Sequence, residues 1–171
     1  MPATLFIGGM KSGKSLLAEK EALLYPAPRL YVATSELIDE EMKKRVELHK
    51  IRRGEQFTTI EEALELDRII NENSHLYSVI LIDCLTFWYN NLFYYQKSFV
   101  EREASLARFA EAVKTCSSQV LMVTNEVGMG IIPENRLARE FVDFSGKANQ
   151  RIAEVCQETY FVLAGKRLKL E

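Results

Sequence analysis

The chain alternates between short apolar runs and longer stretches whose apolar residues recur with helical spacing. Five apolar runs rich in β-branched and aromatic residues predict strands, at residues 4–7, 30–33, 79–82, 120–123 and 160–163. Because helical stretches separate these strands, the order favours an α/β fold with a mainly parallel sheet flanked by helices. The C-terminal residues 164–170 predict a turn and a short edge strand, whose lysines discourage further strand pairing.

Candidate ligand contacts follow the predicted strands, because ligands of parallel α/β sheets gather at the carboxyl ends of the strands. The first strand is followed by residues 8–15, the second by Thr34 and Ser35, the third by Asp83 and the fourth by residues 124–126. We expect these four groups to lie at one edge of the sheet, where a single ligand could touch all of them.

The segment after the first strand reads GGMKSGKS and fits the pattern G-x-x-x-x-G-K-[ST]. In this pattern glycines let the backbone bend around phosphate groups, the lysine supplies positive charge and the serine offers a hydroxyl to Mg²⁺. A strand-forming run precedes the motif and a helix-forming run follows it, which argues against a chance glycine-rich turn. The motif therefore predicts a P-loop NTPase-like fold that holds phosphate with Gly8, Gly9, Met10, Lys11, Ser12, Gly13, Lys14 and Ser15.

A candidate metal-binding acid follows the third strand. Mg²⁺ bound at a phosphate loop normally also meets an acidic residue at the end of a neighbouring apolar strand, and the run SVILID ends in Asp83. We therefore expect Ser15 and Asp83 to bind Mg²⁺. The alternative for such a carboxylate is a helix cap or a turn residue.

Composition narrows the class of protein. The 171 residues, 47% hydrophobic and 27% charged, predict one globular domain over residues 1–171. With 22 Lys and Arg against 24 Asp and Glu, the net charge of −2 gives no overall attraction to nucleic acid or anionic membranes. No apolar run approaches the roughly 18 residues of a membrane span, and the N-terminal residues lack a signal-peptide pattern, so we expect a cytoplasmic protein without a membrane span. Three widely separated cysteines predict neither a disulfide framework nor a zinc site.

One histidine stands out in residues 36–53, which read as a helix. Ile38, Met42, Val46 and His49 share its apolar face. His49 is either a core histidine hydrogen-bonded to a neighbour or a nucleophile, since neutral imidazole forms covalent intermediates near neutral pH. The basic residues that follow it either neutralise phosphate or cap the helix.

Three further groups each have two interpretations. Asn125 and Glu126 follow the fourth strand and serve either the site or a turn. The aromatic residues of 88–95 have helical spacing, which favours a core or subunit contact over a base-stacking surface. The basic residues of 133–154 favour a solvated helix face over an acceptor-phosphate site.

Together these motifs resemble those of a known family. The chain is similar to the bifunctional adenosylcobinamide kinase/adenosylcobinamide-phosphate guanylyltransferase family of cobalamin biosynthesis. The first motif is common to many proteins, whereas the helix ending in His-Lys-x-x-Arg and the TNEVGMGIIP segment are specific. The resemblance spans nearly the whole chain and is carried, in order, by GGMKSGKS, YVATSELIDEEMKKRVELHKIRR, FTTIEE, VILIDCLTFWYNNL and TNEVGMGIIPENRLAREFVDFSGKANQRIAE.

The resemblance implies two activities and a homotrimer. In the first activity a nucleoside triphosphate, ATP or GTP, phosphorylates the aminopropanol hydroxyl of adenosylcobinamide. In the second, a histidine that falls on His49 attacks the α-phosphate of GTP, releases pyrophosphate and carries GMP to adenosylcobinamide phosphate. Beside the phosphate loop, the implied nucleotide contacts are Val32, Ala33, Thr34, Lys50, Ile51, Arg52, Arg53, Glu61 and Asp83.

Some positions depart from the family's common pattern. Lys11 replaces an arginine, Asp83 replaces a glutamate and Phe57 replaces a tryptophan, so charge or aromatic character is kept. Asp is shorter than Glu by one methylene, which leaves direct or water-mediated metal contact open. Two other functions also stay open: a P-loop kinase of another small metabolite without a covalent intermediate, and a nucleotide-dependent switch, which the absence of an N-K-x-D motif at residues 124–127 disfavours.

Overall fold

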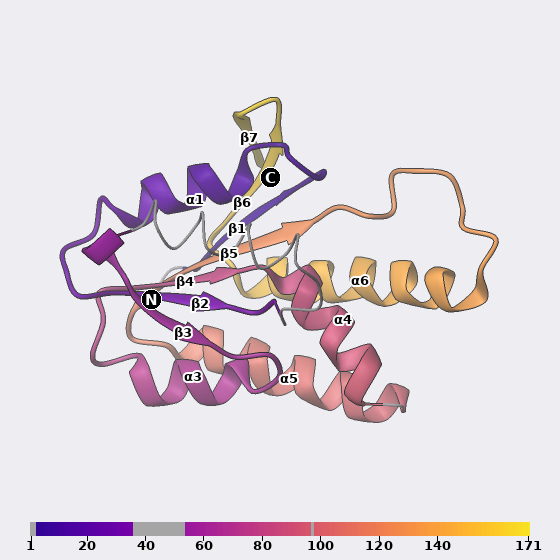
Figure 1. Ribbon diagram of the computed structural model, residues 1–171, viewed down its shortest axis with the longest axis horizontal. Helices are drawn as coiled ribbons and strands as arrows, with labels where there is room; N and C mark the ends of the chain where they lie inside the picture. The colour runs from indigo at the N-terminus through magenta and orange to yellow at the C-terminus, as the bar shows by residue number, and fades with distance from the viewer. Residues whose placement is uncertain (1–2, 36–53, 97) are drawn as a thin grey trace.

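The computed structural model describes residues 3–35, 54–96 and 98–171, and the statements below concern these ranges (Figure 1). The helix expected over residues 36–53 lies outside the described residues. Within the ranges, strands and helices alternate along the chain, as the hydrophobic pattern predicts.

A seven-stranded sheet forms the centre of the fold. The strands lie in the order β3-β2-β4-β5-β1-β6-β7, and neighbours run parallel except for the antiparallel pair β6 and β7. All carboxyl ends of the parallel strands therefore meet at one edge. The strands are β1 (Ala3–Gly8), β2 (Arg29–Ala33), β3 (Thr58–Glu61), β4 (Val79–Asp83), β5 (Gln119–Asn125), β6 (Glu158–Leu163) and β7 (Lys166–Leu170).

Helices cover both faces of the sheet, and a 3₁₀ turn, η1 (Gly54–Gln56), precedes β3. Helix α1 lies on one face and the other four helices lie on the opposite face (Figure 1). Polar caps define where two of them begin. Ser98 and Glu101 form a reciprocal capping box at α5, and the Asn135 side chain accepts a bond from the Ala138 N–H at α6. The helices are α1 (Lys14–Ala22), α3 (Leu66–Asn73), α4 (Leu85–Tyr95), α5 (Phe99–Thr115) and α6 (Arg136–Val155).

The hydrophobic core has two parts, one on each side of the sheet. Successive side chains of a strand point to opposite faces, so β5 sends Val120 and Met122 toward the four-helix side and Leu121 and Val123 toward α1. Because both faces are covered, the central strands β4 and β5 are continuously apolar over residues 79–82 and 120–123 and not alternately polar. This alternation also fixes the face on which the last residue of each strand lies.

The structure confirms the predicted architecture. All five expected strands are present, and residues 166–170 form the expected edge strand. β3 was not predicted as a strand, because it is a short edge strand with mostly exposed side chains and lacks the apolar character of the central strands. In the aromatic segment of α4, Trp88 and Tyr89 are fully buried, as a core role requires, whereas Tyr94 and Tyr95 are exposed.

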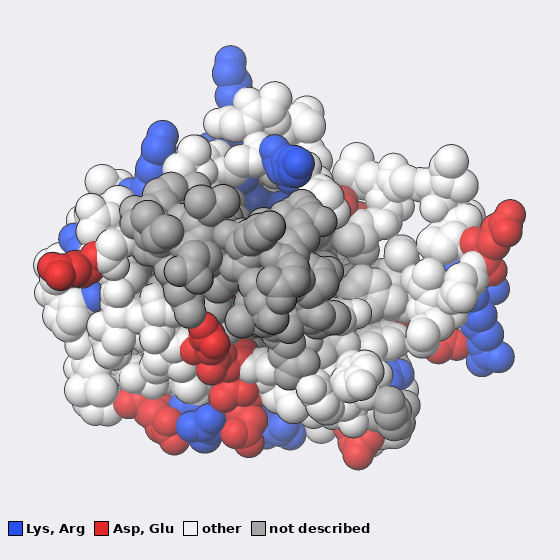
Figure 2. All heavy atoms as spheres, viewed as in Figure 1, with Lys and Arg blue, Asp and Glu red and all other residues white. Residues whose placement is uncertain are grey.

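Charged side chains of both signs lie on the visible face (Figure 2). Acidic and basic side chains intermix over α3 and α5, while the upper part of the loop that projects between β5 and α6 is uncharged (Figure 2). Within the described ranges, no helix combines the length and the apolar character needed to cross a membrane.

Candidate active site

The glycine-rich loop connects β1 to α1 at the carboxyl edge of the sheet. Gly8 ends β1, and a Cβ at this position would collide with the backbone carbonyl oxygen of Val162 on β6. Gly13 has a φ of +98°, in the left-handed region that favours glycine, and directly precedes the helix. The loop is closed by the Ser12 N–H on the Gly9 carbonyl at 3.2 Å and by the Gly165 N–H on the Ser12 carbonyl at 2.8 Å.

Lys14 begins α1 and is 7% exposed. Its Nζ donates to the Gly9 carbonyl oxygen at 2.9 Å, so the side chain folds back over the loop. Burial lowers the pKa of the Lys14 ammonium, and nearby Cys84 and Asp83 oppose that shift. A bound phosphate would add negative charge where the ammonium has lost water, so the lysine gains more from a phosphate here than in open solvent.

Asp83 ends β4 on the same side of the sheet as α1. Leu81 and Val79, two and four residues earlier, belong to the core on that side, so the alternation of the strand turns Asp83 toward α1 as well. One carboxylate oxygen, Oδ2, accepts a hydrogen bond from the Tyr31 hydroxyl of β2 at 3.1 Å. The carboxylate is thus held at the strand end that lies across β5 from the loop.

The predicted metal ligands fit Mg²⁺ chemically. Ser15 lies in the first turn of α1, and Asp83 turns toward that helix from the sheet edge. One hydroxyl and one carboxylate supply hard oxygen donors, and Mg²⁺ is commonly bound by one or two carboxylates together with water and substrate phosphates. The donor chemistry of the two residues fits the metal, and their role as Mg²⁺ ligands stays a prediction.

Residues 32–34, at the end of β2, are predicted to contact the nucleotide, but the fold buries them. Val32, Ala33 and Thr34 are all buried. The Thr34 hydroxyl donates to the Cys84 carbonyl at 2.6 Å and accepts from the Cys84 N–H at 2.9 Å, so it fixes the start of α4. Glu61 ends the neighbouring β3, is paired in register with Ala33, and is exposed.

The structure brings most of the predicted residues to one edge. Glu61, Ala33, Asp83, Asn125 and Gly8 are the last residues of β3, β2, β4, β5 and β1, which are adjacent in that order. Five predicted residues lie outside the described residues: His49, Lys50, Ile51, Arg52 and Arg53.

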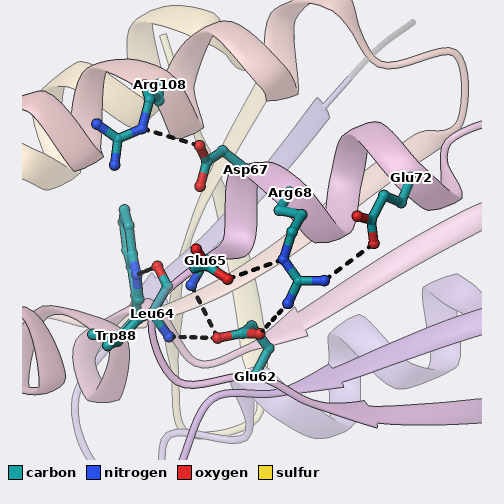
Figure 3. A network of polar contacts seen from close by, with 8 residues as sticks. All are labelled: Glu62, Leu64, Glu65, Asp67, Arg68, Glu72, Trp88 and Arg108. Atoms are coloured by element: carbon teal, nitrogen blue, oxygen red, sulfur yellow. Dashed lines mark hydrogen bonds and ion pairs between the residues drawn. The ribbon is translucent and has the colours of Figure 1, made fainter.

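A polar network beside Glu61 was not anticipated from the sequence (Figure 3). Glu62 accepts from the N–H groups of Leu64 and Glu65 at 2.9 and 3.0 Å and pairs with Arg68 at 2.9 Å. Burial alone would raise the pKa of Glu62, but these two N–H groups and the Arg68 charge leave it below its usual value. Glu62 thereby fixes the connection between β3 and α3. The sequence signal for this network was the spacing of Glu65, Arg68 and Glu72, which places opposite charges three and four residues apart on one helix.

The second missed group is a set of buried or half-buried polar side chains around the end of β5, from Thr86, Tyr89, Thr124 and Asn149. In the sequence, Asn149 could have been recognised as a polar residue on the mainly apolar, buried face of α6.

Comparison with known proteins identifies the family of this chain. The model of a family described as cobinamide kinase / cobinamide phosphate guanyltransferase matches residues 4–170. The bifunctional adenosylcobalamin biosynthesis protein CobU of Escherichia coli (strain K12) is 37% identical over 180 residues, which cover 98% of each chain. The protein of the same name from Salmonella typhimurium is 38% identical over 180 residues, again 98% of each chain.

Among solved structures, the crystal structure of the RadB recombinase shares the fold. It superposes with a TM-score of 0.54 at 15% sequence identity and covers 94% of this chain and 73% of the recombinase chain. Together with the parallel sheet and the glycine-rich loop, this likeness confirms the predicted P-loop NTPase-like fold. The full-length sequence matches confirm the family that the motifs predicted, and the chain belongs to the cobinamide kinase / cobinamide phosphate guanyltransferase family of enzymes.

Proposed function

We propose that the protein phosphorylates adenosylcobinamide and then transfers GMP from GTP to adenosylcobinamide phosphate, giving adenosylcobinamide-GDP. The observation that carries this proposal is the family match over residues 4–170, joined to a glycine-rich loop whose Lys14 lies near Asp83. Two curated relatives that cover almost the whole chain are named as bifunctional proteins of adenosylcobalamin biosynthesis, which supports two activities in one chain.

In the kinase step, the aminopropanol hydroxyl oxygen attacks the terminal phosphorus of ATP or GTP. The bond from that phosphorus to the bridging oxygen breaks, the nucleoside diphosphate leaves, and the hydroxyl proton passes to solvent. Backbone N–H groups of residues 8–15 and the Lys14 ammonium offset the charge on the phosphate oxygens. Mg²⁺, when bound by Ser15 and Asp83, would supply further positive charge between the phosphates.

In the transfer step, an imidazole nitrogen of His49 attacks the α-phosphorus of GTP and pyrophosphate leaves. A phosphate oxygen of adenosylcobinamide phosphate then attacks the same phosphorus and the bond to His49 breaks. Lys50, Arg52 and Arg53 follow His49 directly in sequence and would neutralise the departing pyrophosphate. Val32, Ala33, Thr34, Ile51 and Glu61 complete the proposed GTP contacts.

A labelling experiment tests the transfer step. Protein is mixed with Mg²⁺ and GTP labelled at the α-phosphate, then denatured, and the label on the chain is counted. We expect an acid-labile, base-stable adduct that is absent in His49→Asn. The chain has 2 histidines, so His75→Asn is the matched control and should keep the adduct. Absence of any adduct, with phosphorylation of a small molecule still occurring, would instead favour a P-loop kinase without a covalent intermediate.

We further propose a cytoplasmic homotrimer. Support for self-association comes from the projecting loop of residues 126–135, where Met129, Ile131 and Ile132 are 78%, 98% and 79% exposed (Figure 1). Exposed apolar side chains gathered on one projection commonly mark a protein contact.

A further inference from the structure

A closed ring of hydrogen bonds joins the backbone N–H and the backbone carbonyl of one residue, Asn125, at the end of β5. The Asn125 N–H donates to Thr86 Oγ1 at 2.7 Å, and Thr86 Oγ1 lies 3.3 Å from Thr124 Oγ1. Thr124 Oγ1 donates to Asn149 Oδ1 at 3.0 Å, and Asn149 Nδ2 donates to the Asn125 carbonyl at 3.4 Å. The chain of bonds therefore starts at the N–H of Asn125 and returns to its own carbonyl oxygen.

The direction of every bond in the ring is determined. Thr124 has one hydroxyl hydrogen, which it gives to Asn149, so Thr86 must donate to Thr124. Tyr89 donates a second bond to Asn149 Oδ1 at 3.1 Å. Thr124, Asn149 and Tyr89 are all buried, where breaking a single bond would strand a polar group. The ring thus holds the backbone of Asn125 on both its donor and its acceptor side.

The ring leaves the Asn125 side chain unused. Its carboxamide makes no hydrogen bond to any residue of the described ranges, although its backbone is held by two. Asn125 lies two residues beyond Val123, which packs on the α1 side of the sheet, so alternation turns its side chain to that same side. Thr124 points the opposite way and supplies the ring.

The Asn125 side chain lies at the sheet edge between the phosphate loop and Asp83. β5 separates β4 from β1, Asn125 is paired in register with Gly8, and Asp83 is paired with Val123 two residues earlier. The Glu126 N–H also donates to the Gly8 carbonyl at 3.0 Å, so the strand end is tied to the start of the loop. An amide donor is therefore held at the edge between the loop and the metal-binding acid.

We propose that the Asn125 carboxamide donates a hydrogen bond to the terminal phosphate of the bound nucleoside triphosphate, and that the Thr86–Thr124–Asn149–Tyr89 ring positions it. This inference rests on the proposed kinase activity. Because the backbone of Asn125 is fixed before the nucleotide binds, its side chain loses little conformational entropy on bonding to the phosphate. Such a preorganised donor is most effective at the phosphoryl group that is transferred, because charge develops there. The ring residues act through Asn125 and are positioning residues.

Binding measurements test the contact without any corrinoid. Asn125→Ala should lower affinity for a triphosphate with a non-hydrolysable β–γ bridge by about 10-fold or more, and leave affinity for the diphosphate within about twofold, because only the terminal phosphate loses a donor. In the kinase assay, kcat should fall by about 10- to 100-fold. The control is Asn73→Ala, whose amide donates to Ile69 within α3 and should change neither affinity.

Variants of Thr124 test the ring. Thr124→Val removes the hydroxyl at nearly constant shape and should reproduce the selective loss of triphosphate affinity, while Thr124→Ser restores the hydroxyl and should recover it within about threefold. Thermal unfolding of both variants verifies that they are folded. If Thr124→Val fails to fold, the Asn125→Ala comparison decides alone.

The outcomes separate this inference from the proposed function. Equal losses of diphosphate and triphosphate affinity in Asn125→Ala would mark a general structural role and overturn the contact, as would no loss at all. A wild-type protein that binds nucleotide but fails to phosphorylate adenosylcobinamide would overturn the proposed function. The affinities of Asn125→Ala for diphosphate and triphosphate would still test the contact to the terminal phosphate.

Discussion

Gly8 illustrates how a single residue joins the loop to the sheet. It is the last residue of β1, is paired with Asn125 on one side and with Val162 on the other, and has no room for a Cβ against the Val162 carbonyl. The obstructing atom belongs to the backbone of a strand, so it cannot rotate away as a flexible side chain would. The requirement for glycine here comes from close packing and not from an unusual φ.

We therefore predict that Gly8→Ala destabilises the protein by about 1–3 kcal/mol, because β1 and β6 must separate to admit the methyl group. Thermal unfolding of the free protein measures the change, and nucleotide affinity should fall with it. Gly9→Ala is the matched control, since a Cβ at Gly9 would meet nothing within 4 Å. Equal melting temperatures for the two variants would show that the strands accommodate the methyl group.

Residues near one another in sequence were the predictable part of the site. The loop motif and the acid after an apolar strand specify Gly8, Lys14 and Asp83, and the alternation of strands and helices places them at one edge. The polar ring was not predictable, because Tyr89 and Asn149 are 60 residues apart and meet only through helix packing. For the same reason nothing local showed that the Thr34 hydroxyl is bound to Cys84.

At the scale of elements, the connection from β3 to α3 depends on one carboxylate. Glu62 bonds to two N–H groups at the start of α3 and to Arg68, and Trp88 of α4 donates to the Leu64 carbonyl at 2.9 Å (Figure 3). Asp67 and Arg108 join α3 to α5 beside it at 3.1 Å. These contacts hold the end of β3, and hence Glu61, relative to the helical layer.

The lowered pKa of Glu62 predicts part of the acid sensitivity. A carboxyl whose folded pKa lies below the unfolded value of 4.5 stabilises the fold above that pH, and the contribution is lost as pH falls through the folded pKa. Between about pH 7 and 3, Glu62→Gln should therefore show a shallower fall in melting temperature than the wild type. Glu111→Gln, at an exposed position without an ion pair in the described structure, should follow the wild-type curve. Parallel curves for Glu62→Gln and the wild type would contradict the assignment.

At the scale of the whole molecule, the loop between β5 and α6 projects from the body of the protein and carries several exposed apolar side chains (Figure 1). In this loop Met129, Ile131 and Ile132 are 78%, 98% and 79% exposed, whereas the side chains of the two core clusters are buried. The loop leaves the same strand end that carries Asn125. The loop therefore begins at the sheet edge that carries the phosphate loop.

We predict that Ile131→Glu disrupts the proposed trimer, because it places a charge in an apolar contact. Sedimentation velocity should show a shift from three chains toward one. Leu24→Glu, at an exposed leucine after α1, is the control and should sediment like the wild type. A wild-type protein that sediments as a single chain would overturn the trimer, and an unchanged Ile131→Glu trimer would exclude the loop as its contact.

The place of β5 between the phosphate loop and Asp83 restricts how this chain can vary in length. One residue inserted or deleted within β5 would exchange the faces of Thr124 and Asn125, directing the hydroxyl to the nucleotide and the carboxamide into the helical layer. Substitutions along this strand alter one contact at a time, whereas a change of length reverses both. Insertions and deletions here should therefore be far less acceptable than replacements.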